Sequence, residues 1–342
     1  MKRLESEKGR ILIPAVILVA VIAAVVAAVQ VSRQGSKRSR LGSEYQLDLS
    51  SLSHIDPELI LYEETGEPIR TRLFESRALA ADPSGILYVA GDETIRVIDP
   101  EDRTMASLPL AVSPRCLVVT EKELIIGTWD RVLVADKNGE VQAEWPGLGE
   151  DARFTSIAVD HEHVFVADAG QRIVWCFDRT GRFIRRIGDK DPERGIPGFV
   201  IPSPYFDQAM APDGLLRVAN TGRQSIEAYT AGGDRELAWG RFGNNLEDFT
   251  SCCNPVNFAI LPDGSIVTCE KGIVRVKVYD SGGRLTGVVA GPRQFAGDAR
   301  SSYETPAQGK QIILDVAVDA AGRVYILDRA RNVIRIFTKK KA

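Results

Sequence analysis

The chain has 342 residues, 44% of them hydrophobic and 26% charged, which are the proportions of a globular protein with a full-sized core and not of a disordered one. Residues 1–40 hold eight Lys and Arg against two Glu, so the remaining residues, 35 basic and 44 acidic, carry a net charge of −9. This acidic body argues against a nucleic-acid partner, and the three histidines argue against a histidine-rich metal centre.

The first predicted element is a helix over residues 11–31, a run of twenty-one residues without charge. At 1.5 Å per residue it is about 30 Å long, enough to cross a bilayer core. The alternative is a cleaved signal peptide, whose apolar region is usually about 7–15 residues and precedes a small-x-small cleavage site. The run here is longer and AAVQVSRQGS offers no good site, so the sequence favours an uncleaved single-pass transmembrane helix.

The orientation of this helix is not fixed by charge, because four basic residues before the span are matched by four after it. Long soluble domains are translocated largely regardless of flanking charge, whereas a ten-residue cationic tail readily stays inside. We therefore expect residues 1–10 to be cytoplasmic and residues 32–55, rich in Ser, Arg and Gly, to be a linker. The remainder, residues 56–342, would then lie outside the cytoplasm at the cell membrane.

After the linker the chain repeats one outline six times, in segments that begin at Arg77, Pro114, Thr155, Asp207, Asn257 and Leu314. Each segment has a short apolar strand, a turn, a second apolar strand, a polar turn and a third strand with period-2 alternation, and several have a fourth strand. The residues that follow the second strands are spaced by 37, 40, 52, 50 and 58 positions. Such a pitch, roughly 40–50 residues, is typical of four-stranded propeller blades.

The sixth segment runs out of chain after its third strand, while an unmatched strand pattern, LILYEETGEPIRTRL, precedes the first. The simplest closure has this N-terminal stretch completing blade six, which removes two open sheet edges. The predicted fold of residues 56–342 is therefore an all-β, six-bladed propeller.

The outline IAVD…VFVADAGQRIVWCFDRTGRFIRRIG resembles the NHL-repeat family of six-bladed β-propellers, over most of the chain after the predicted helix. The resemblance is specific for fold and uninformative for activity, since relatives of this kind include binding scaffolds, ligand sensors and a few lactonases or lyases. Blades one and two depart most from the pattern: TEKE replaces an Asp-x-x-Gly turn, and GDE and TWD replace Asp-x-Gly turns.

In a propeller, the loop that leads into a blade's first strand and the turn after its second strand share one face. The longest insertions, residues 188–206, 240–256 and 291–313, also belong to that face, and long loops without secondary structure are frequently functional. We therefore expect the loop face of blades three to six to bind a protein or small-ligand partner. The candidate residues on this face are Asp168, Asn220, Cys252, Cys253, Asn254, Cys269, Glu270, Lys271 and Asp328.

Four of these candidates, Asp168, Asn220, Glu270 and Asp328, occupy equivalent turn positions in four blades, and all carry oxygen donors. Oxygen donors suit a hard divalent cation such as calcium, and the sugar-lactonase propellers are similar in using a Glu/Asn/Asp set for a divalent ion. Asp and Asn are also ordinary turn residues, so a metal site and a purely structural role both stay open.

The five cysteines divide into two groups. Cys116 and Cys176 fall within apolar strands and are expected to be buried, whereas Cys252 and Cys253 lie in a polar loop. A bond between adjacent cysteines is strained, because neighbouring α-carbons are about 3.8 Å apart and relaxed disulfides prefer about 5.5–6 Å. We therefore expect a thiol cluster in which Cys269 bridges to one member of the pair.

Three function classes follow. The leading one is a membrane-tethered binding scaffold outside the cytoplasm, which assigns no catalytic residue. The second is a metal-dependent hydrolytic enzyme of the lactonase or lyase type, although no Ser/His/Asp arrangement or paired-carboxylate motif supports it. The third is a redox-linked accessory protein that uses Cys252 and Cys253.

Overall fold

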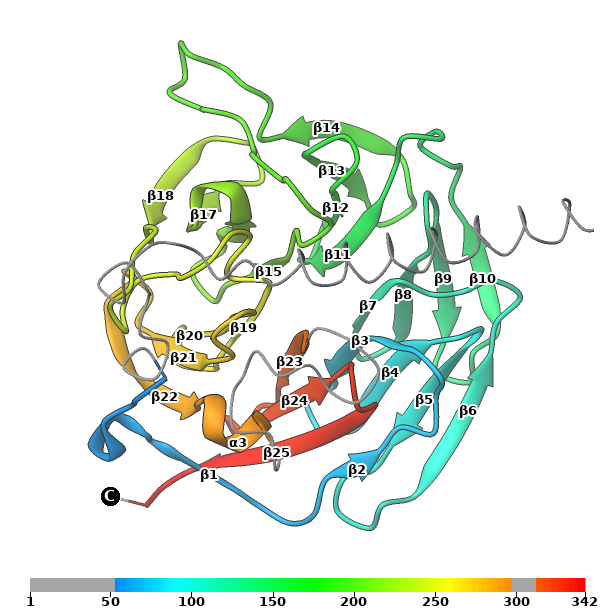
Figure 1. The fold of residues 1–342 in the computed structure, drawn as a ribbon. Helices are drawn as coiled ribbons and strands as arrows, with labels where there is room; N and C mark the ends of the chain where they lie inside the picture. The colour runs from blue at the N-terminus through cyan, green and yellow to red at the C-terminus, as the bar shows by residue number, and fades with distance from the viewer. Residues whose placement is uncertain (1–52, 297–311, 342) are drawn as a thin grey trace, which may run out of the picture. The chain divides into compact units, whose positions relative to one another are not determined.

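The computed structural model describes residues 53–296 and 312–341, which fold into an all-β propeller of six blades arranged around a central opening (Figure 1). Within these residues no helix has the length and apolarity to cross a bilayer. The predicted transmembrane helix, residues 11–31, and nearly all of the predicted linker lie outside the described residues.

Each blade is an antiparallel sheet whose strands follow one another from the central opening outward. Blade one contains β3 (Ser76–Ala81), β4 (Leu87–Gly91), β5 (Thr94–Ile98) and β6 (Met105–Pro109). Blade two contains β7 (Cys116–Val119), β8 (Glu123–Gly127), β9 (Val132–Asp136) and β10 (Val141–Glu144). Blade three contains β11 (Phe154–Val159), β12 (His163–Asp168), β13 (Ile173–Asp178) and β14 (Phe183–Ile187).

The second half of the ring repeats the arrangement. Blade four contains β15 (Gln208–Met210), β16 (Leu216–Asn220), β17 (Ser225–Tyr229) and β18 (Arg235–Trp239), with the short 3-10 helix η3 (Thr221–Arg223) between its second and third strands. Blade five contains β19 (Asn257–Ile260), β20 (Ile266–Cys269), β21 (Val276–Tyr279) and β22 (Leu285–Ala290), and is followed by the short helix α3 (Pro292–Ala296). Blade six contains β23 (Leu314–Val318), β24 (Val324–Asp328) and β25 (Val333–Lys339) from the C-terminal end.

The predicted closure of the ring is confirmed. After the 3-10 helix η2 (Pro57–Leu59), the N-terminal strands β1 (Tyr62–Glu64) and β2 (Ile69–Arg70) both pair antiparallel with β25, and β1 lies along it in Figure 1. The same segment also contacts blade five, because Leu61 donates its backbone N–H to Val288 O at 3.0 Å. The N-terminal strands therefore cover the outer edge of blade six and join it to its neighbour.

Aspartate side chains close many of the hairpins between first and second or third and fourth strands. Asp82 Oδ1 accepts from the backbone N–H groups of Ser84 and Ile86, and Gly85 supplies the left-handed conformation (φ +92°) that the turn needs. In blade two, where TEKE breaks the repeat, the Thr120 hydroxyl accepts from Lys122 and Glu123 instead. The departure in sequence therefore preserves the same turn.

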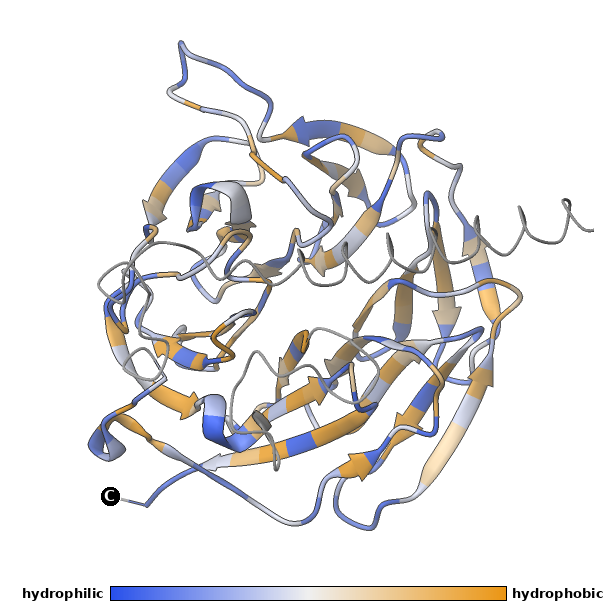
Figure 2. Cartoon of the chain, in the orientation of Figure 1, coloured by the Kyte–Doolittle hydropathy of each residue, from blue (hydrophilic) through white to orange (hydrophobic). Residues whose placement is uncertain are grey.

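The hydrophobic core lies between adjacent blades. Apolar residues alternate along the strands and pack against those of the neighbouring sheet. For example, Tyr88 of blade one and Leu124 of blade two belong to one buried cluster. Many of the polar residues lie in the loops (Figure 2). The second strand of each blade is sandwiched on both faces, and every residue of β4, β16 and β24 is buried. The packing of each blade thus depends on both of its neighbours.

Candidate functional site: the central cavity and its mouth

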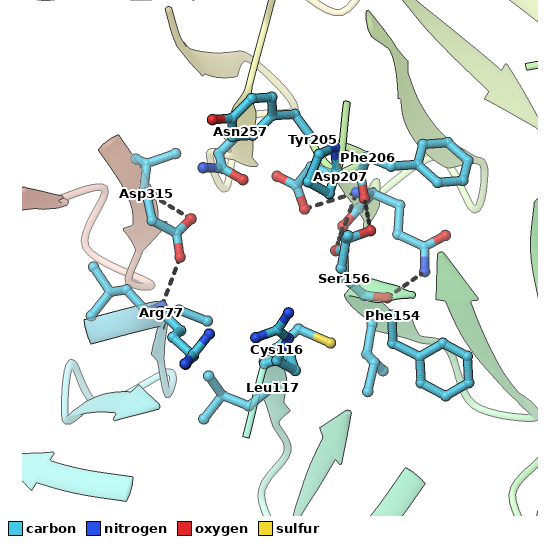
Figure 3. A pocket seen from close by; sticks show the side chains of 18 of the residues that line it. Arg77, Cys116, Leu117, Phe154, Ser156, Tyr205, Phe206, Asp207, Asn257 and Asp315 are labelled. Atoms are coloured by element: carbon cyan, nitrogen blue, oxygen red, sulfur yellow. Dashed lines mark hydrogen bonds between the residues drawn. The ribbon is translucent and has the colours of Figure 1, made fainter. Parts of the chain in front are cut away.

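The central opening holds a cavity of about 1410 Å³, lined by the first strands of all six blades and by the loops that lead into them. Figure 3 shows side chains from these strands surrounding the space. The mouth lies on the predicted face, because the loops before the first strands and the turns after the second strands meet there. For example, Val256 donates its N–H to Cys269 O at 2.9 Å.

Each blade contributes one residue at an equivalent position to the cavity wall. This residue comes four positions before the first residue of the turn that joins the blade's first and second strands. We call this set the polar tier, because four of its six members carry polar side chains. The polar tier consists of Ala78, Cys116, Ser156, Asp207, Asn257 and Asp315.

The polar tier links blade four to blade five, blade five to blade six and blade six to blade one. Asp207 Oδ2 accepts from Phe258 N at 2.8 Å, Asn257 Nδ2 donates to Leu314 O at 2.6 Å, and Asp315 Oδ2 accepts from Leu79 N at 2.7 Å. These bonds satisfy backbone groups on the free inner edges of the first strands. No such bond joins blade two to its neighbours in the described structure, and there the tier carries Ala78 and Cys116.

The two carboxyl groups of the polar tier face the cavity and not the outer surface. Desolvation, together with the nearby Asp315 carboxyl, raises the pKa of Asp207 to about 7. Desolvation raises the pKa of Asp315 to about 6, against the opposing effects of the Leu79 hydrogen bond and the Arg329 charge. The deeper part of the cavity therefore holds two carboxyl groups that take up protons near neutral pH.

Four arginines surround the mouth, and we call them the arginine cluster: Arg77, Arg115, Arg153 and Arg329. Only Arg77 pairs with a carboxylate, that of Glu75 at 2.7 Å. Burial lowers the pKa of the Arg115 guanidinium, and the positive charges of Arg77 and Arg329 lower it further. The negative charge of Glu75 has the opposite effect. The cluster thus concentrates four positive charges around the mouth, of which only that of Arg77 forms an ion pair within the described residues.

Aromatic side chains complete the mouth. Two guanidinium groups lie over the Trp129 ring, with Arg115 Cζ 3.9 Å and Arg153 Cζ 4.6 Å from the ring centre. No hydrogen bond or ion pair joins the Arg115 guanidinium to another residue of the described chain. Phe74, which also lines the cavity, is 93% exposed. The mouth therefore offers a free guanidinium group next to accessible apolar surface.

The four oxygen-bearing turn residues do not converge on one point. Asp168 Oδ1 accepts from three backbone N–H groups of its own blade and Oδ2 accepts from Trp175, whereas Asn220 contacts Val200 and Glu227. Asp328 likewise accepts from the turn that follows it. Across residues 53–296 and 312–341 no group of three or more His, Cys, Asp or Glu side chains is placed to hold a metal ion. The geometry favours the structural role for these turn residues.

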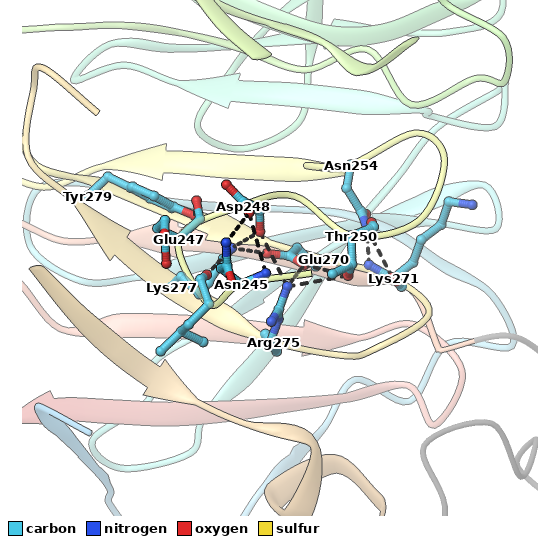
Figure 4. Close-up of polar contacts among 11 residues, drawn as sticks. Asn245, Glu247, Asp248, Thr250, Asn254, Glu270, Lys271, Arg275, Lys277 and Tyr279 are labelled. Carbon is cyan, nitrogen blue, oxygen red and sulfur yellow. Dashed lines mark hydrogen bonds and ion pairs between the residues drawn. The ribbon is translucent and has the colours of Figure 1, made fainter. Parts of the chain in front are cut away.

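Glu270 belongs to a buried charge network in blade five (Figure 4). Its Oε2 contacts Arg275 at 2.7 Å, its Oε1 pairs with Lys277, and all three side chains are at most 1% exposed. Desolvation lowers the pKa of Lys277 to about 8, although Glu270 opposes the shift. Lys277 also donates to Leu246 O and Asp248 O, so the network holds the long loop 240–256 against the blade.

The predicted bridge from Cys269 is wrong in this structure, in which all five cysteines are free thiols. The Cys269 side chain is fully buried in the apolar cluster between blades five and six, whereas Cys252 is exposed in the loop. The structure does bring together Cys252, Cys253, Asn254 and Lys271, because Asn254 Oδ1 accepts from Lys271 N and Asn254 Nδ2 donates to Lys271 O. The burial expected for Cys116 and Cys176 is confirmed.

Neither the polar tier nor the arginine cluster was predicted from the sequence. Aligning the first strands by the turns that follow them would have revealed the tier, because polar residues are uncommon at the buried positions of an apolar strand and indicate a specific role. The arginines gave a weaker signal, because Arg77 and Arg115 are equivalent positions whereas Arg153 and Arg329 come from different loops. Only the fold brings these four together.

Comparisons with known proteins establish the fold alone. No protein-family profile and no curated protein sequence matches the chain. Among solved structures, a streptogramin B lyase is similar with a TM-score of 0.55 and 11% identity, over 82% of this chain and 98% of that one. A gluconolactonase from Xanthomonas campestris is similar with a TM-score of 0.55 and 16% identity, over 81% and 91%. The WD40 propeller domain of Doa1 is similar with a TM-score of 0.51 and 15% identity, over 77% of this chain and 78% of that one.

Proposed function

We propose that this chain is a membrane-tethered binding protein of the NHL-like propeller class, which holds an anionic group of its ligand or protein partner at the mouth of the central cavity. The single observation that carries this proposal is the arginine cluster. The guanidinium groups of Arg77 and Arg329 both lie close enough to Arg115 to lower its pKa. Among the described residues, Glu75 pairs with Arg77 and the Asp315 carboxyl interacts with Arg329, whereas Arg115 forms no ion pair. Such an arrangement is stabilised by a bound anion.

The chemistry of the mouth indicates the class of ligand. Guanidinium groups bind carboxylate and phosphate in planar, two-point geometry, and a free Arg115 is available for this contact. Phe74 and Trp129 add apolar surface beside the charge, and aromatic residues with arginine are enriched where proteins bind partners. We therefore expect a ligand in which a carboxylate or phosphate group lies next to an apolar portion.

Binding is favoured over hydrolysis by what lines the cavity. None of the chain's three histidines, His54, His161 and His163, is among its lining residues. The names of the lyase and gluconolactonase neighbours describe those proteins, and at 11% and 16% identity they bring no catalytic residue to this chain. The arginine cluster, in contrast, is a feature of this chain's own residues.

Replacement of Arg115 by Gln should weaken anion binding by roughly 10–100-fold, since a hydrogen bond to a charged group contributes about 1.5–3 kcal/mol. Citrate is a suitable probe, because its carboxylates can engage several guanidinium groups at once. Calorimetric titration of citrate into the full-length chain at low ionic strength measures the affinity, which should fall as salt is added.

The matched control is Arg284→Gln, which removes an arginine of blade five whose side chain is 83% exposed and which does not line the cavity. It changes the net charge by the same amount and should leave citrate binding unaltered. Equal affinities for the wild-type chain and Arg115→Gln, or no binding of citrate to either, would contradict the proposed anion site.

The tether is tested separately. We propose that residues 11–31 hold the protein in the membrane with the propeller outside the cytoplasm, as their length and lack of charge favour. A reporter enzyme that is active only in the cytoplasm, fused after Ala342, should then be silent, while the same reporter fused before Met1 should be active. Activity of the C-terminal fusion would reverse the proposed topology.

A further inference from the structure

A second group of reactive side chains lies outside the cavity, in the loop before blade five and the turn after its second strand. Cys252 is exposed, and Lys271 Nζ donates to its sulfur at 3.8 Å. The Lys271 side chain is only 8% exposed, and its other contact is with the Tyr205 ring, 5.5 Å away. No carboxylate neutralises this ammonium group within the described structure. A buried, unpaired cation is thus directed at an accessible sulfur.

The neighbouring thiol differs from Cys252 in every respect that matters for reactivity. Cys253 is 4% exposed, and desolvation raises its pKa, an effect that the Cys252 thiol reinforces and the Lys271 charge opposes. Cys252 and Cys253 are consecutive residues of one loop, and the Cys252 thiol influences the pKa of Cys253, so the two thiols lie close to one another. An exposed thiol beside a cation and a buried thiol beside it are the two components that thiol–disulfide exchange requires, one to attack and one to resolve.

The loop holds this arrangement in a strained backbone. Ser251 and Cys253 both adopt the left-handed region, at φ +66° and +64°, which is costly for residues with a side chain. Buried Asn254 fixes the loop by donating to Thr250 O and Lys271 O and by accepting from Lys271 N. The hydrogen bonds of Asn254 therefore fix the position of the loop that carries both thiols relative to blade five. They also fix the backbone of Lys271, whose amine lies beside Cys252.

We propose that Cys252 and Cys253 form a thiol–disulfide exchange site, with Cys252 as the attacking sulfur, Lys271 as its cationic partner and Cys253 as the resolving thiol. The Cys252 thiolate attacks one sulfur of an incoming disulfide, which forms a mixed disulfide and releases the first thiolate. Cys253 then attacks Cys252 Sγ, loses its proton and releases the second. Two electrons and the two thiol protons pass from the pair to the incoming disulfide, which leaves as two thiols.

The bond formed between adjacent cysteines is strained by the short spacing of their α-carbons, and strain makes a disulfide more reducible. The oxidised pair would accordingly pass its oxidising equivalents on to another dithiol. The remaining cysteines take no part: burial raises the pKa of Cys116 to about 12 and of Cys176 to about 11, and raises that of Cys269 well above its ordinary value. This inference does not depend on the anion site.

The experiment uses the full-length chain with glutathione disulfide as the probe, quenched with acid and followed by intact and peptide mass spectrometry. With glutathione disulfide in large excess over reduced glutathione, the wild-type chain should end with Cys252 joined to Cys253 and two glutathione molecules released. Cys253→Ser should instead accumulate the mixed disulfide at Cys252, because the resolving thiol is gone. Cys252→Ser should react at least roughly tenfold more slowly, since only the buried thiol remains.

Lys271→Met tests the role of the cation and should slow the first step by roughly tenfold, whereas Lys271→Arg should retain most of the rate. The backbone contacts of residue 271 with Asn254 are kept in both variants, and circular dichroism confirms that each is folded. Equal rates for wild type and Cys252→Ser, no mixed disulfide in Cys253→Ser, or persistence of the mixed disulfide in the wild-type chain would overturn the proposal.

Discussion

A chain that begins at Leu73 should aggregate, or melt roughly 10 °C below a chain that begins at Ser53. The missing residues include β1 and β2, which pair with β25 and bury Tyr62 and Ile69 to 4% and 5% exposure. Burial of such side chains contributes about 1.5–3 kcal/mol each, and 1 kcal/mol corresponds to about 2–4 °C in a protein of this size. The truncation also exposes the outer edge of β25 as an unpaired strand.

The matched control is a chain that begins at Ile60. It lacks η2 but keeps Leu61, β1 and β2, so it should melt close to the chain that begins at Ser53. Differential scanning calorimetry with light scattering at several protein concentrations separates a lowered melting temperature from aggregation. If the chain that begins at Leu73 is as stable as the longer two, the N-terminal strands do not close the ring.

The architecture was predictable from the sequence because it is repeated. Six copies of one strand and turn pattern specify six blades, and the incomplete sixth copy specifies where the N-terminal strand must pair. Even the break at TEKE in blade two is absorbed locally, since Thr120 replaces an aspartate as the hydrogen-bond acceptor of the turn. The repeat pattern thus contains the information that determines the fold.

The site was less predictable for the same reason. Residues that recur at a fixed position in the repeat, such as Asp168 and Asp328, turn out to bind their own turns. The arginine cluster, in contrast, combines residues of blades one, two, three and six, and only Trp129, over whose ring Arg115 and Arg153 lie, comes from a departure from the repeat. The candidate site therefore depends on residues that the repeat pattern does not single out.

Cys269 shows a second limit of sequence reasoning. Its position next to Glu270 and Lys271 suggested an exposed turn, but residue 269 is the last residue of β20 and its side chain points into the cluster between blades. Lys271, two residues on, reaches Cys252. Successive side chains of a strand point to opposite sides, so the direction of the Cys269 side chain depends on whether β20 ends before or after residue 269. The position of that strand end was seen only in the structure.

Replacement of Glu270 by Gln should destabilise the folded chain by about 3–5 kcal/mol, the range seen when one partner of a buried ion pair is removed. Gln keeps the size of the side chain but removes the negative charge that faces Arg275 and Lys277, both at most 1% exposed. The exposed Glu236→Gln is the matched control and should leave stability within about 0.5 kcal/mol of wild type. Urea unfolding followed by fluorescence measures both.

The loss caused by Glu270→Gln should also depend on pH, and the direction follows from Lys277. Its folded pKa of about 8 lies below the ordinary value of 10.5, so protonation favours the unfolded chain and stability rises with pH across that interval. Without Glu270 the folded pKa of Lys277 falls further, because the largest influence that raises it is lost. The mutational loss should therefore be greater at pH 6 than at pH 9, where the lysine is largely neutral in both folded proteins.

A double variant distinguishes charge from packing. Adding Lys277→Met to Glu270→Gln removes one of the two uncompensated cations, so part of the lost stability, at least about 1 kcal/mol, should return. If the loss arises from packing alone, the second substitution should instead add to it, because Lys277 also donates to Leu246 O and Asp248 O. The Glu270 carboxylate also accepts from the Thr250 hydroxyl, which belongs to the loop that carries Cys252 and Cys253. The single variant should therefore also slow thiol exchange, and the double variant should not restore that rate.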